Sequence, residues 1–519
     1  MANKNVFKNK KTRVKAQKAT VLNNAGGRAY KMQDEHALAQ LACTGCLRNT
    51  YYTTGQDQLS TVLELCNGVS DEFIAKVAVY SRSDGFMKDM PALLTAVLSV
   101  RNPELMRKIF PAVINDGKML RNFVQIIRSG TVGRTSLGSA PKKMIQNWFN
   151  TRDGNQIFRQ SIGNDPTLMD VVKLAHVNPV EKDKDALFKY LMSKEYNKRN
   201  LPSLVKELEA FKEGKQDEAP EIPFLMLTAL ELTDKNWKEI AQNASWQSTR
   251  MNLNTFLRHK VFSNKTMIKL VAERLKDVEL IKKANVFPYQ LFTAYKHVSD
   301  DMPREITDAL HDAMELATNN VPEIDGKVYV AVDCSGSMSS PVTGHNGTAT
   351  SKVSCVDVAA LVGATFLRKN TNCEVIAFGT NVVPCRLDGR DTIMTNSQKL
   401  SKCNGGGTNC SAPLAKLNRE NAKGNLFVLV SDNESWIDSR SAQHGNTAVM
   451  QEWEKFKSRN PNAKMICIDL TPNVTTQAVD REDILNCGGF SDSVFDVIHA
   501  FSKSKGSKHW VEVINKIKL

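Results

Sequence analysis

The chain has 519 residues, of which 41% are hydrophobic and 24% charged, a composition typical of a globular protein with two or three domains. No apolar stretch reaches the roughly 18 residues that a membrane-spanning helix needs, and eleven cysteines, an odd number, favour a reducing cytoplasm over a disulfide framework. The formal net charge of +14 predicts a polyanionic partner, with RNA or DNA as the leading candidates.

Residues 1–25 are predicted to form a flexible basic arm. Its basic residues are Lys4, Lys8, Lys10, Lys11, Arg13, Lys15 and Lys18, and the first twenty residues contain no acidic residue. The arm lacks the apolar segment of a secretory signal peptide. A tail of this kind increases affinity for phosphates without reading sequence, although a disordered solubilising tail fits the same residues equally well.

Residues 26–322 are predicted to form a helical repeat domain. Apolar residues recur three and four positions apart, as in Ile268, Val271 and Leu275, with charged residues off that face. Short polar breaks separate these segments, which favours stacked helical pairs, an α-solenoid with roughly six or seven pairs of the HEAT type. Residues 212–223, rich in Lys, Glu and Pro, are predicted to be an exposed connector.

From Gly326 the pattern changes to alternating strands and helices, which is typical of a doubly wound α/β domain. The predicted strands are 327–332, 373–378, 426–431 and 464–469, and the predicted helices are 353–369, 410–421, 445–458 and 493–503. We therefore place the second domain at residues 323–519. The expected fold is an α-solenoid joined to a doubly wound α/β domain.

Oxygen donors follow two of these strands. Asp333, Ser335 and Ser337 alternate along the chain, so their oxygens can point to one side. Thr408, in a glycine-rich loop, and Asp432, at a later strand end, are the further donors, and such a set suits a hard divalent cation such as Mg²⁺. The pattern resembles the metal-ion-dependent adhesion site of von Willebrand factor A-type domains. Ordinary strand-to-loop turns without an ion are the alternative interpretation.

With the two parts joined, the chain resembles the Ro autoantigen family, whose members carry a TROVE module, and its bacterial members in particular. The resemblance is carried by Asn49-Thr50-Tyr51-Tyr52 with Gly55, Leu174-Ala175-His176 before Pro179, WQSTRMNLNT at 246–255, KANVFPY at 283–289 and Asp432-Asn433-Glu434-Ser435-Trp436. It implies a monomeric ring of HEAT-like repeats that is closed by the A-type domain.

The resemblance also implies an RNA-binding function. Members of the family bind small structured non-coding RNAs, the Y RNAs, on the outer surface and take single-stranded 3′ ends of defective RNAs into the central hole. Bacterial members resemble an adaptor in which the Y RNA tethers an exoribonuclease. The residues themselves contain no catalytic constellation, since the glycine-rich loop lacks the lysine of a phosphate-binding loop, so we do not expect an enzyme.

The resemblance places a Y RNA-binding surface in the middle of the helical domain. His176 matches a family histidine needed for Y RNA binding, and Arg159 matches a basic family position, whereas Gly163 stands where vertebrate members have a second basic residue. The predicted surface consists of Lys142, Lys143, Arg159, Lys173 and His176. A hydrogen-bonded, partly buried histidine and solvated lysines are the structural alternatives.

Four residues of the segment that matches best, Arg250, Asn254, Arg258 and His259, are predicted to line the hole. The first three are spaced by four residues, which would place them on one helical face. Such a stripe suits a single-stranded nucleic acid. Hydrogen bonding between repeats is the competing interpretation.

Two classes of function therefore stand side by side. The favoured one is a cytoplasmic RNA-binding adaptor in RNA quality control. The alternative is a metal-dependent protein-binding module, in which an acidic side chain of a partner fills the open position on the cation.

Overall fold

The computed structural model describes residues 18–284, 286, 288–318, 323–345, 353–440, 445–489, 493–503 and 510–519. Most of the predicted basic arm, residues 1–17, lies outside this range. Residues 18–25 belong to the folded part, where β1 (Val21–Leu22) pairs with β2 (Arg28–Lys31).

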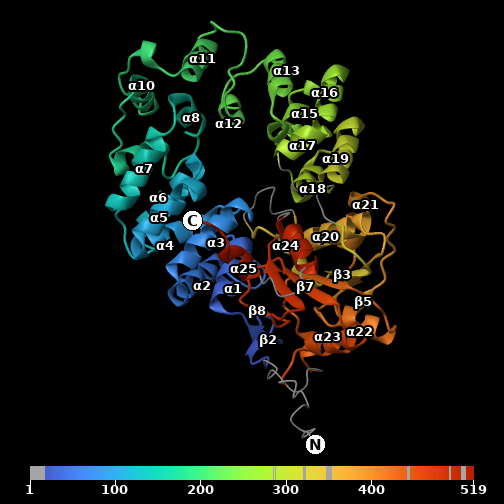
Figure 1. The fold of residues 1–519 in the computed structure, drawn as a ribbon. Coiled ribbons are helices and arrows are strands. Elements are labelled where there is room, and N and C mark those ends of the chain that lie inside the picture. Colours follow the sequence, from blue (N-terminus) through green and yellow to red (C-terminus); the bar gives the residue numbers. More distant parts are fainter. Residues whose placement is uncertain are drawn as a thin grey trace, which may run out of the picture.

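The helical array has two limbs that rise from the α/β domain and meet at the far end of the molecule (Figure 1). The first limb contains α1 (Asp34–Thr44), α2 (Gly55–Gly68), α3 (Asp71–Ser83), α4 (Asp89–Arg101), α5 (Pro103–Val113), α6 (Gly117–Arg128), α7 (Ser139–Asn150), α8 (Gly154–Arg159), α9 (Leu168–Ala175), α10 (Lys182–Leu191) and α11 (Ser203–Lys212). The second contains α12 (Phe224–Leu227), α13 (Asp234–Asn243), α14 (Trp246–Met251), α15 (Leu253–Arg258), α16 (Lys265–Leu275), α17 (Val278–Ala284), α18 (Pro288–His297) and α19 (Arg304–Ala317). The predicted connector at 212–223 joins the two limbs.

Local sequence explains where these helices begin and which face they bury. Thr54, Ser70 and Asp116 accept hydrogen bonds from backbone N–H groups of the first turns of α2, α3 and α6, which would otherwise have no intrahelical partner. In α6, Phe123 and Ile127 lie on the buried face, four residues apart, so that stripe packs into the core of the array.

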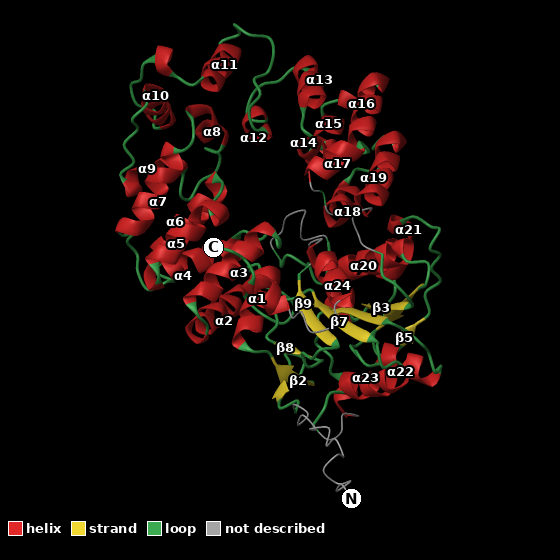
Figure 2. Ribbon diagram, viewed as in Figure 1, coloured by secondary structure: helices red, strands yellow, loops and turns green. Residues whose placement is uncertain are grey.

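The α/β domain contains a six-stranded sheet in the order β5 (Val382–Val383), β4 (Cys373–Phe378), β3 (Val328–Asp333), β6 (Leu426–Ser431), β7 (Lys464–Asp469) and β9 (Ile484–Gly488). All neighbours are parallel except β5, which runs antiparallel to β4. The helices α20 (Cys355–Lys369), α21 (Ile393–Ser401) and α24 (Ser493–Lys503) cover one face, and α22 (Ala412–Arg419) and α23 (Ala448–Arg459) cover the other (Figure 2). The predicted fold class is thus confirmed.

Alternate residues of the central strand face two separate cores. Val328, Val330 and Val332 point to the α20 side, and Tyr329 and Ala331 point to the α22 and α23 side. The core on the α20 side is continuous with that of the helical array, so the two parts of the chain share one apolar interior.

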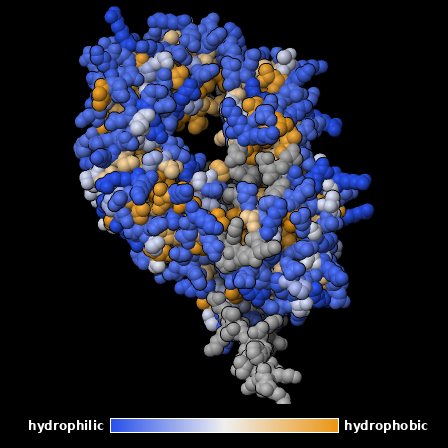
Figure 3. Space-filling view, in the orientation of Figure 1, coloured by the Kyte–Doolittle hydropathy of each residue, from blue (hydrophilic) through white to orange (hydrophobic). Residues whose placement is uncertain are grey.

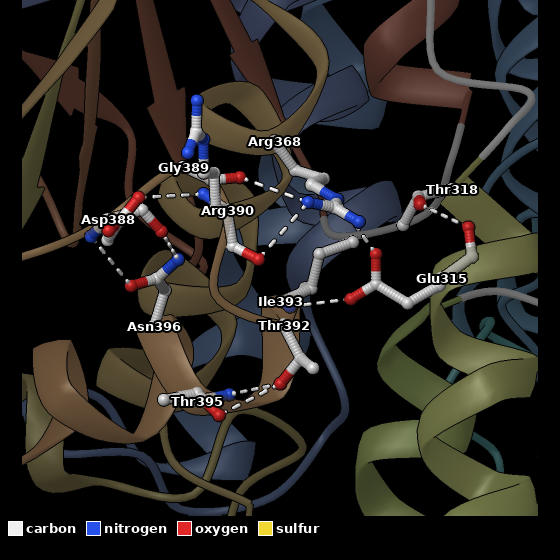
Figure 4. A network of polar contacts seen from close by, with 10 residues as sticks. All are labelled: Glu315, Thr318, Arg368, Asp388, Gly389, Arg390, Thr392, Ile393, Thr395 and Asn396. Atoms are coloured by element: carbon white, nitrogen blue, oxygen red, sulfur yellow. Dashed lines mark hydrogen bonds and ion pairs between the residues drawn. The ribbon is translucent and has the colours of Figure 1, made fainter.

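The end of the helical array is attached to the α/β domain by polar contacts (Figure 4). Glu315 of α19 pairs with Arg368 of α20 at 3.0 Å and accepts a hydrogen bond of 2.7 Å from the N–H of Ile393. Lys296 of α18 pairs at 2.6 Å with Asp357, which is 3% exposed. One end of the array is therefore fixed on α20 and α21.

The two chain ends attach the start of the array to the same domain. The strand β2 pairs with β8 (Thr475–Thr476) of the α/β half, whereas α25 (Trp510–Asn515), at the other end of the chain, packs against α3 and α1. The indole N–H of Trp510 donates a 3.0 Å hydrogen bond to the hydroxyl of Tyr80. Both ends of the array thus meet one α/β domain, and Figure 3 shows an opening through the helical half of the resulting ring.

No helix within the described ranges is both long and apolar enough to cross a membrane.

We predict that replacing Trp510 with Ala lowers the free energy of unfolding by about 3–5 kcal/mol, because it removes a fully buried indole and leaves Tyr80 without its partner. Urea denaturation followed by circular dichroism measures this loss. Val180→Ala is the control, since Val180 is 87% exposed and its loss should change stability by less than about 0.5 kcal/mol. Equal stability of the two variants would contradict the role given to α25.

Candidate functional site

A hollow on the first limb brings basic side chains together from three helices. Arg128 comes from the last turn of α6, Lys142 from the first turns of α7, and Lys173 and His176 from the end of α9. The hollow has a volume of about 670 Å³, and its remaining lining residues are Thr135, Ser136, Leu137, Gly138, Ser139 and Leu174. We call it the basic hollow. None of its lining residues is acidic.

His176 does not lie within a helix. It follows α9 in a left-handed conformation, with φ of 54° and ψ of 49°, and its side chain is exposed. The backbone is fixed by hydrogen bonds from the Gln146 amide to the carbonyls of Ala175 and His176, at 2.9 and 3.4 Å. A non-glycine residue in this conformation is uncommon and is often part of a functional site. Its ring therefore faces solvent at the rim of the hollow.

The first turn of α7 adds backbone dipoles to the hollow. Its N-cap is Gly138, with φ of +72°, which has no side chain to accept a hydrogen bond from the first N–H groups. Helix N-termini carry partial positive charge, so the backbone reinforces the basic side chains there.

Two other predicted residues lie away from the basic hollow. Lys143 is exposed but does not line it, and Arg159 lines a different cavity of about 870 Å³ beside the connector. That cavity also contains Glu207, Glu218, Glu221 and Glu239. The structure therefore brings together Lys142, Lys173 and His176 but separates Arg159 from them.

Gly163 is explained by its neighbour. A Cβ atom added there would lie 2.3 Å from the guanidinium of Arg121, and the residue has φ of +115°. The side chain of Arg121 thus occupies the space that a basic side chain at 163 would need.

The residues predicted to line the hole are not on one helical face. The helix breaks at Asn252, whose amide donates a 2.8 Å hydrogen bond to the carbonyl of Ser248, so Arg250 lies in α14 and Asn254 and Arg258 lie in α15. An Asn side chain that binds a nearby carbonyl competes with the helical pattern. The expectation of a single continuous face was wrong for this reason.

Two of these residues hold helices together. Arg250 donates to the Gln290 carbonyl at 2.8 Å and to the Gln247 side chain, and burial lowers the pKa of its guanidinium to about 10. The side-chain amide of Asn254 donates a 2.6 Å hydrogen bond to the His297 carbonyl, and its oxygen accepts one of 2.9 Å from the N–H of Ser299. These contacts agree with the competing interpretation of hydrogen bonding between repeats.

The other two residues are arranged differently. Arg258 is exposed, and its guanidinium donates at 3.3 Å to Thr255 of the same helix. The ring of His259 stacks on Trp237 with centroids 3.9 Å apart, and burial is the main cause that lowers its pKa. Arg258 is therefore exposed and is hydrogen-bonded within its own helix, whereas the exposed Asn254 is bonded to the end of α18.

The predicted oxygen donors meet at the carboxyl edge of the sheet. Asp333 is the last residue of β3, and Asp432 follows β6. Thr408 lies in the glycine-rich loop, whose Gly406 carbonyl accepts a 2.9 Å hydrogen bond from the N–H of Gly336. Among the described residues no group of three or more His, Cys, Asp and Glu side chains has the arrangement of a metal site, so any cation here would depend on the hydroxyl donors as well as the two carboxylates.

Burial shapes the electrostatics of this edge. Burial first, and the neighbouring Asp432 carboxylate second, raise the pKa of Asp333, while a 2.6 Å hydrogen bond from Ser431 opposes the rise. Burial likewise raises the pKa of Asp432, and burial with repulsion from Asp432 raises that of Glu434 to about 7. Carboxylates forced together in this way fit a bound cation, because a divalent charge would offset their repulsion.

Sequence reasoning missed Arg128 and Ser431. Arg128 ends an amphipathic helix and looks like any solvated residue there, whereas Ser431 directly precedes Asp432 and could have been noticed as a polar residue that ends an apolar strand.

Comparison with known proteins agrees with this architecture. Residues 327–502 match the family model of the Ro60 vWA domain. The RNA-binding protein RO60 of Deinococcus radiodurans is 24% identical, over 93% of this chain and 96% of its own length. The RNA-binding protein RO60 of Caenorhabditis elegans is 23% identical, over 45% of this chain and 36% of its own length.

The crystal structure of the D. radiodurans RO protein covers 91% of this chain and 99% of its own, with a TM-score of 0.60 at 17% identity. The chain is similar to Ro proteins over nearly its whole length. The relatives are named as RNA-binding proteins and not as enzymes.

A cluster of thiols lies beside the sheet edge. The thiols of Cys334 and Cys385 are both hydrogen-bonded to Cys403, which lies just before the glycine-rich loop. The bond from Cys334, with the second from Cys385, lowers the pKa of Cys403 to about 6. Cys403 is half-buried, so its thiolate is accessible at neutral pH.

We predict that iodoacetamide alkylates Cys403 faster than the other half-buried thiols at pH 7, with a rate that is half-maximal near pH 6. Cys373 is the internal control, since burial raises its pKa to about 12. Peptide mass spectrometry after brief labelling measures both rates. Labelling of Cys403 no faster than Cys373, or only above pH 8, would refute the assignment.

Proposed function

We propose that this protein binds a small structured RNA of the Y type on the outer surface of its helical array, with the phosphate backbone in the basic hollow. The observation that carries the proposal is the convergence of Arg128, Lys142 and Lys173 on one hollow with the exposed ring of His176 at its rim. Guanidinium and ammonium groups bind phosphate, and an imidazole can stack on an unpaired base or donate to phosphate. The names of the relatives support RNA as the polyanion.

The composition of the two cavities supports the basic hollow as the RNA-binding site. The larger cavity, at Arg159, contains four glutamates, which would repel a phosphate backbone. The basic hollow contains no acidic side chain. Electrostatics therefore favour the smaller hollow, although the larger one offers more space.

Single-stranded 3′ ends of defective RNA are the second ligand we propose, bound in the opening of the ring. Figure 3 shows an opening, and Figure 2 places α8 of the first limb on one side of it and α14 of the second limb on the other. Arg258 is exposed and available to a phosphate, while Arg250 and Asn254 contribute by holding this wall together. We further propose that the protein is a monomeric ring, acts in the cytoplasm and meets an exoribonuclease through the bound RNA.

A divalent cation, Mg²⁺ in the first instance, is the cofactor we propose for the sheet edge. Asp333, Ser335, Ser337 and Thr408 would hold it, with Asp432 acting through water. It would supply positive charge to a pair of buried carboxylates and no bond-breaking chemistry. The alternative function, a protein-binding module that works through this cation, requires an accessible coordination position, and the burial of all five donors does not favour it.

We predict that the double variant Lys142→Gln/Lys173→Gln binds a structured RNA more weakly and with a shallower dependence on salt. Each lost phosphate contact removes roughly one unit from the slope of log affinity against log salt, so the double variant should lose about one to two units. Filter binding at a series of salt concentrations measures both affinity and slope.

Lys143→Gln is the matched control, because Lys143 is exposed, neighbours Lys142 and does not line the basic hollow. Its affinity and slope should remain close to those of the wild type. The proposal fails if Lys143→Gln and the double variant weaken binding equally, or if neither does.

We predict that Mg²⁺ raises the melting temperature of the wild-type protein by roughly a few degrees and that Asp432→Asn abolishes this rise, because the ion binds the folded state alone. Differential scanning fluorimetry with and without Mg²⁺ measures it. Asp391→Asn, at an exposed ion pair with Lys399, should leave the rise intact. An unchanged melting temperature of the wild-type protein in Mg²⁺ would contradict the proposal that a cation binds at the sheet edge.

A further inference from the structure

The candidate cation site is closed in this structure. The exposed fractions of its donors are 0% for Asp333, 1% for Asp432, 2% for Thr408, 4% for Ser335 and 6% for Ser337. A site that binds the carboxylate of another protein has to present its open side to solvent. Something within the chain therefore covers these donors.

The cover includes Tyr52, from the loop between α1 and α2. Its hydroxyl is hydrogen-bonded to Ser337, and Ser337 is in turn hydrogen-bonded to Asp432. Burial first, and the Asp432 carboxylate second, raise the pKa of Tyr52, so the phenol keeps its proton at this place. A side chain of the helical array thus reaches two of the proposed cation donors.

The loop that carries Tyr52 is fixed on the α/β domain by its backbone. The N–H of His345 donates a 2.9 Å hydrogen bond to the carbonyl of Asn49. Gly344 has φ of +71°, and a Cβ added there would lie 2.8 Å from Cys46 Sγ and from Arg48 Cβ, so the two loops approach as closely as glycine allows. The residues just before Tyr52 in the sequence are therefore held against the α/β domain.

The segment before α1 contacts the loop that follows Asp432. Glu434, two residues after Asp432, accepts hydrogen bonds from the Asn24 amide at 2.8 Å and from the N–H of Ala25 at 3.1 Å. Asn23 donates at 2.7 Å to the carbonyl of Ser435. Residues that precede the helical array in sequence thus hold the chain that follows β6.

We propose that Tyr52 closes the cation site from within the chain, so that a bound divalent cation clamps the start of the helical array onto the A-type domain instead of recruiting an acidic partner. The inference rests on the cation site of the proposed function and assigns that site a partner, which is the chain itself. The cation and the Tyr52 contact strengthen each other, since coupling between two contacts made in the same closed state is reciprocal. Opening of the ring at this junction then requires loss of both.

The test compares Tyr52→Phe with Tyr51→Phe. Both variants remove one phenolic hydroxyl, but Tyr51 is 60% exposed and its hydroxyl has no partner among the proposed donors. Isothermal titration with Mn²⁺ or Mg²⁺ measures affinity, and hydrogen exchange of the backbone amides of residues 45–55 measures opening of the loop. We expect Tyr52→Phe to weaken cation affinity roughly 2- to 10-fold, as for the loss of one hydrogen bond, and Tyr51→Phe to leave it unchanged.

Hydrogen exchange separates the possible failures. In the wild type, the cation should slow exchange in 45–55, and Tyr52→Phe should remove most of that slowing. Cation binding of equal strength in both variants, with no slowing of this loop, would overturn the clamp while leaving the cation site in place. No cation binding by the wild type would remove the site itself, and cation-dependent capture of an acidic peptide by the wild type would show that the site is open to partners.

Discussion

Closure of the ring depends on one α/β domain meeting both ends of the helical array. The far end is held by ion pairs and hydrogen bonds from α18 and α19 to α20 and α21. The near end is held by the two ends of the chain. The N-terminal strand β2 pairs with β8 of the α/β domain, and the C-terminal helix α25 packs against α1 and α3 of the helical array. Since the apolar core on the α20 side continues into the array, neither part can be separated without exposing buried surface. The opening between the two limbs follows from this closure (Figure 3).

The fold places basic and acidic side chains in separate clusters. A net charge of +14 says little alone, but the fold gathers basic side chains in the basic hollow, which has no acidic lining residue, and gathers glutamates beside Arg159. At the sheet edge it does the opposite, because it buries Asp333 and Asp432 beside serine hydroxyls, and burial raises the pKa of both carboxyl groups. These two distributions of charge suit the polyanion and the cation that we propose as ligands.

Much of the α/β domain could be predicted, because buried parallel strands are continuous apolar runs. The strands 373–378, 426–431 and 464–469 lie where the sequence placed them, whereas β9 was missed because Ile484–Gly488 is short and contains Asn486. Contacts between distant segments were not predictable. No local pattern could show that Arg128 joins Lys142, or that Asn252 splits the stripe at 250–258, since both depend on packing and side-chain hydrogen bonds.

The most direct test of the central claim is to locate RNA on the folded protein by ultraviolet crosslinking of a Y-type RNA with a free 3′ tail, followed by peptide mass spectrometry. The account predicts that the structured part of the RNA crosslinks to peptides around residues 135–142 and 173–176 and that the tail crosslinks to residues around 254–259. Crosslinks confined to the A-type domain, or to the glutamate-lined cavity beside Arg159, would contradict it.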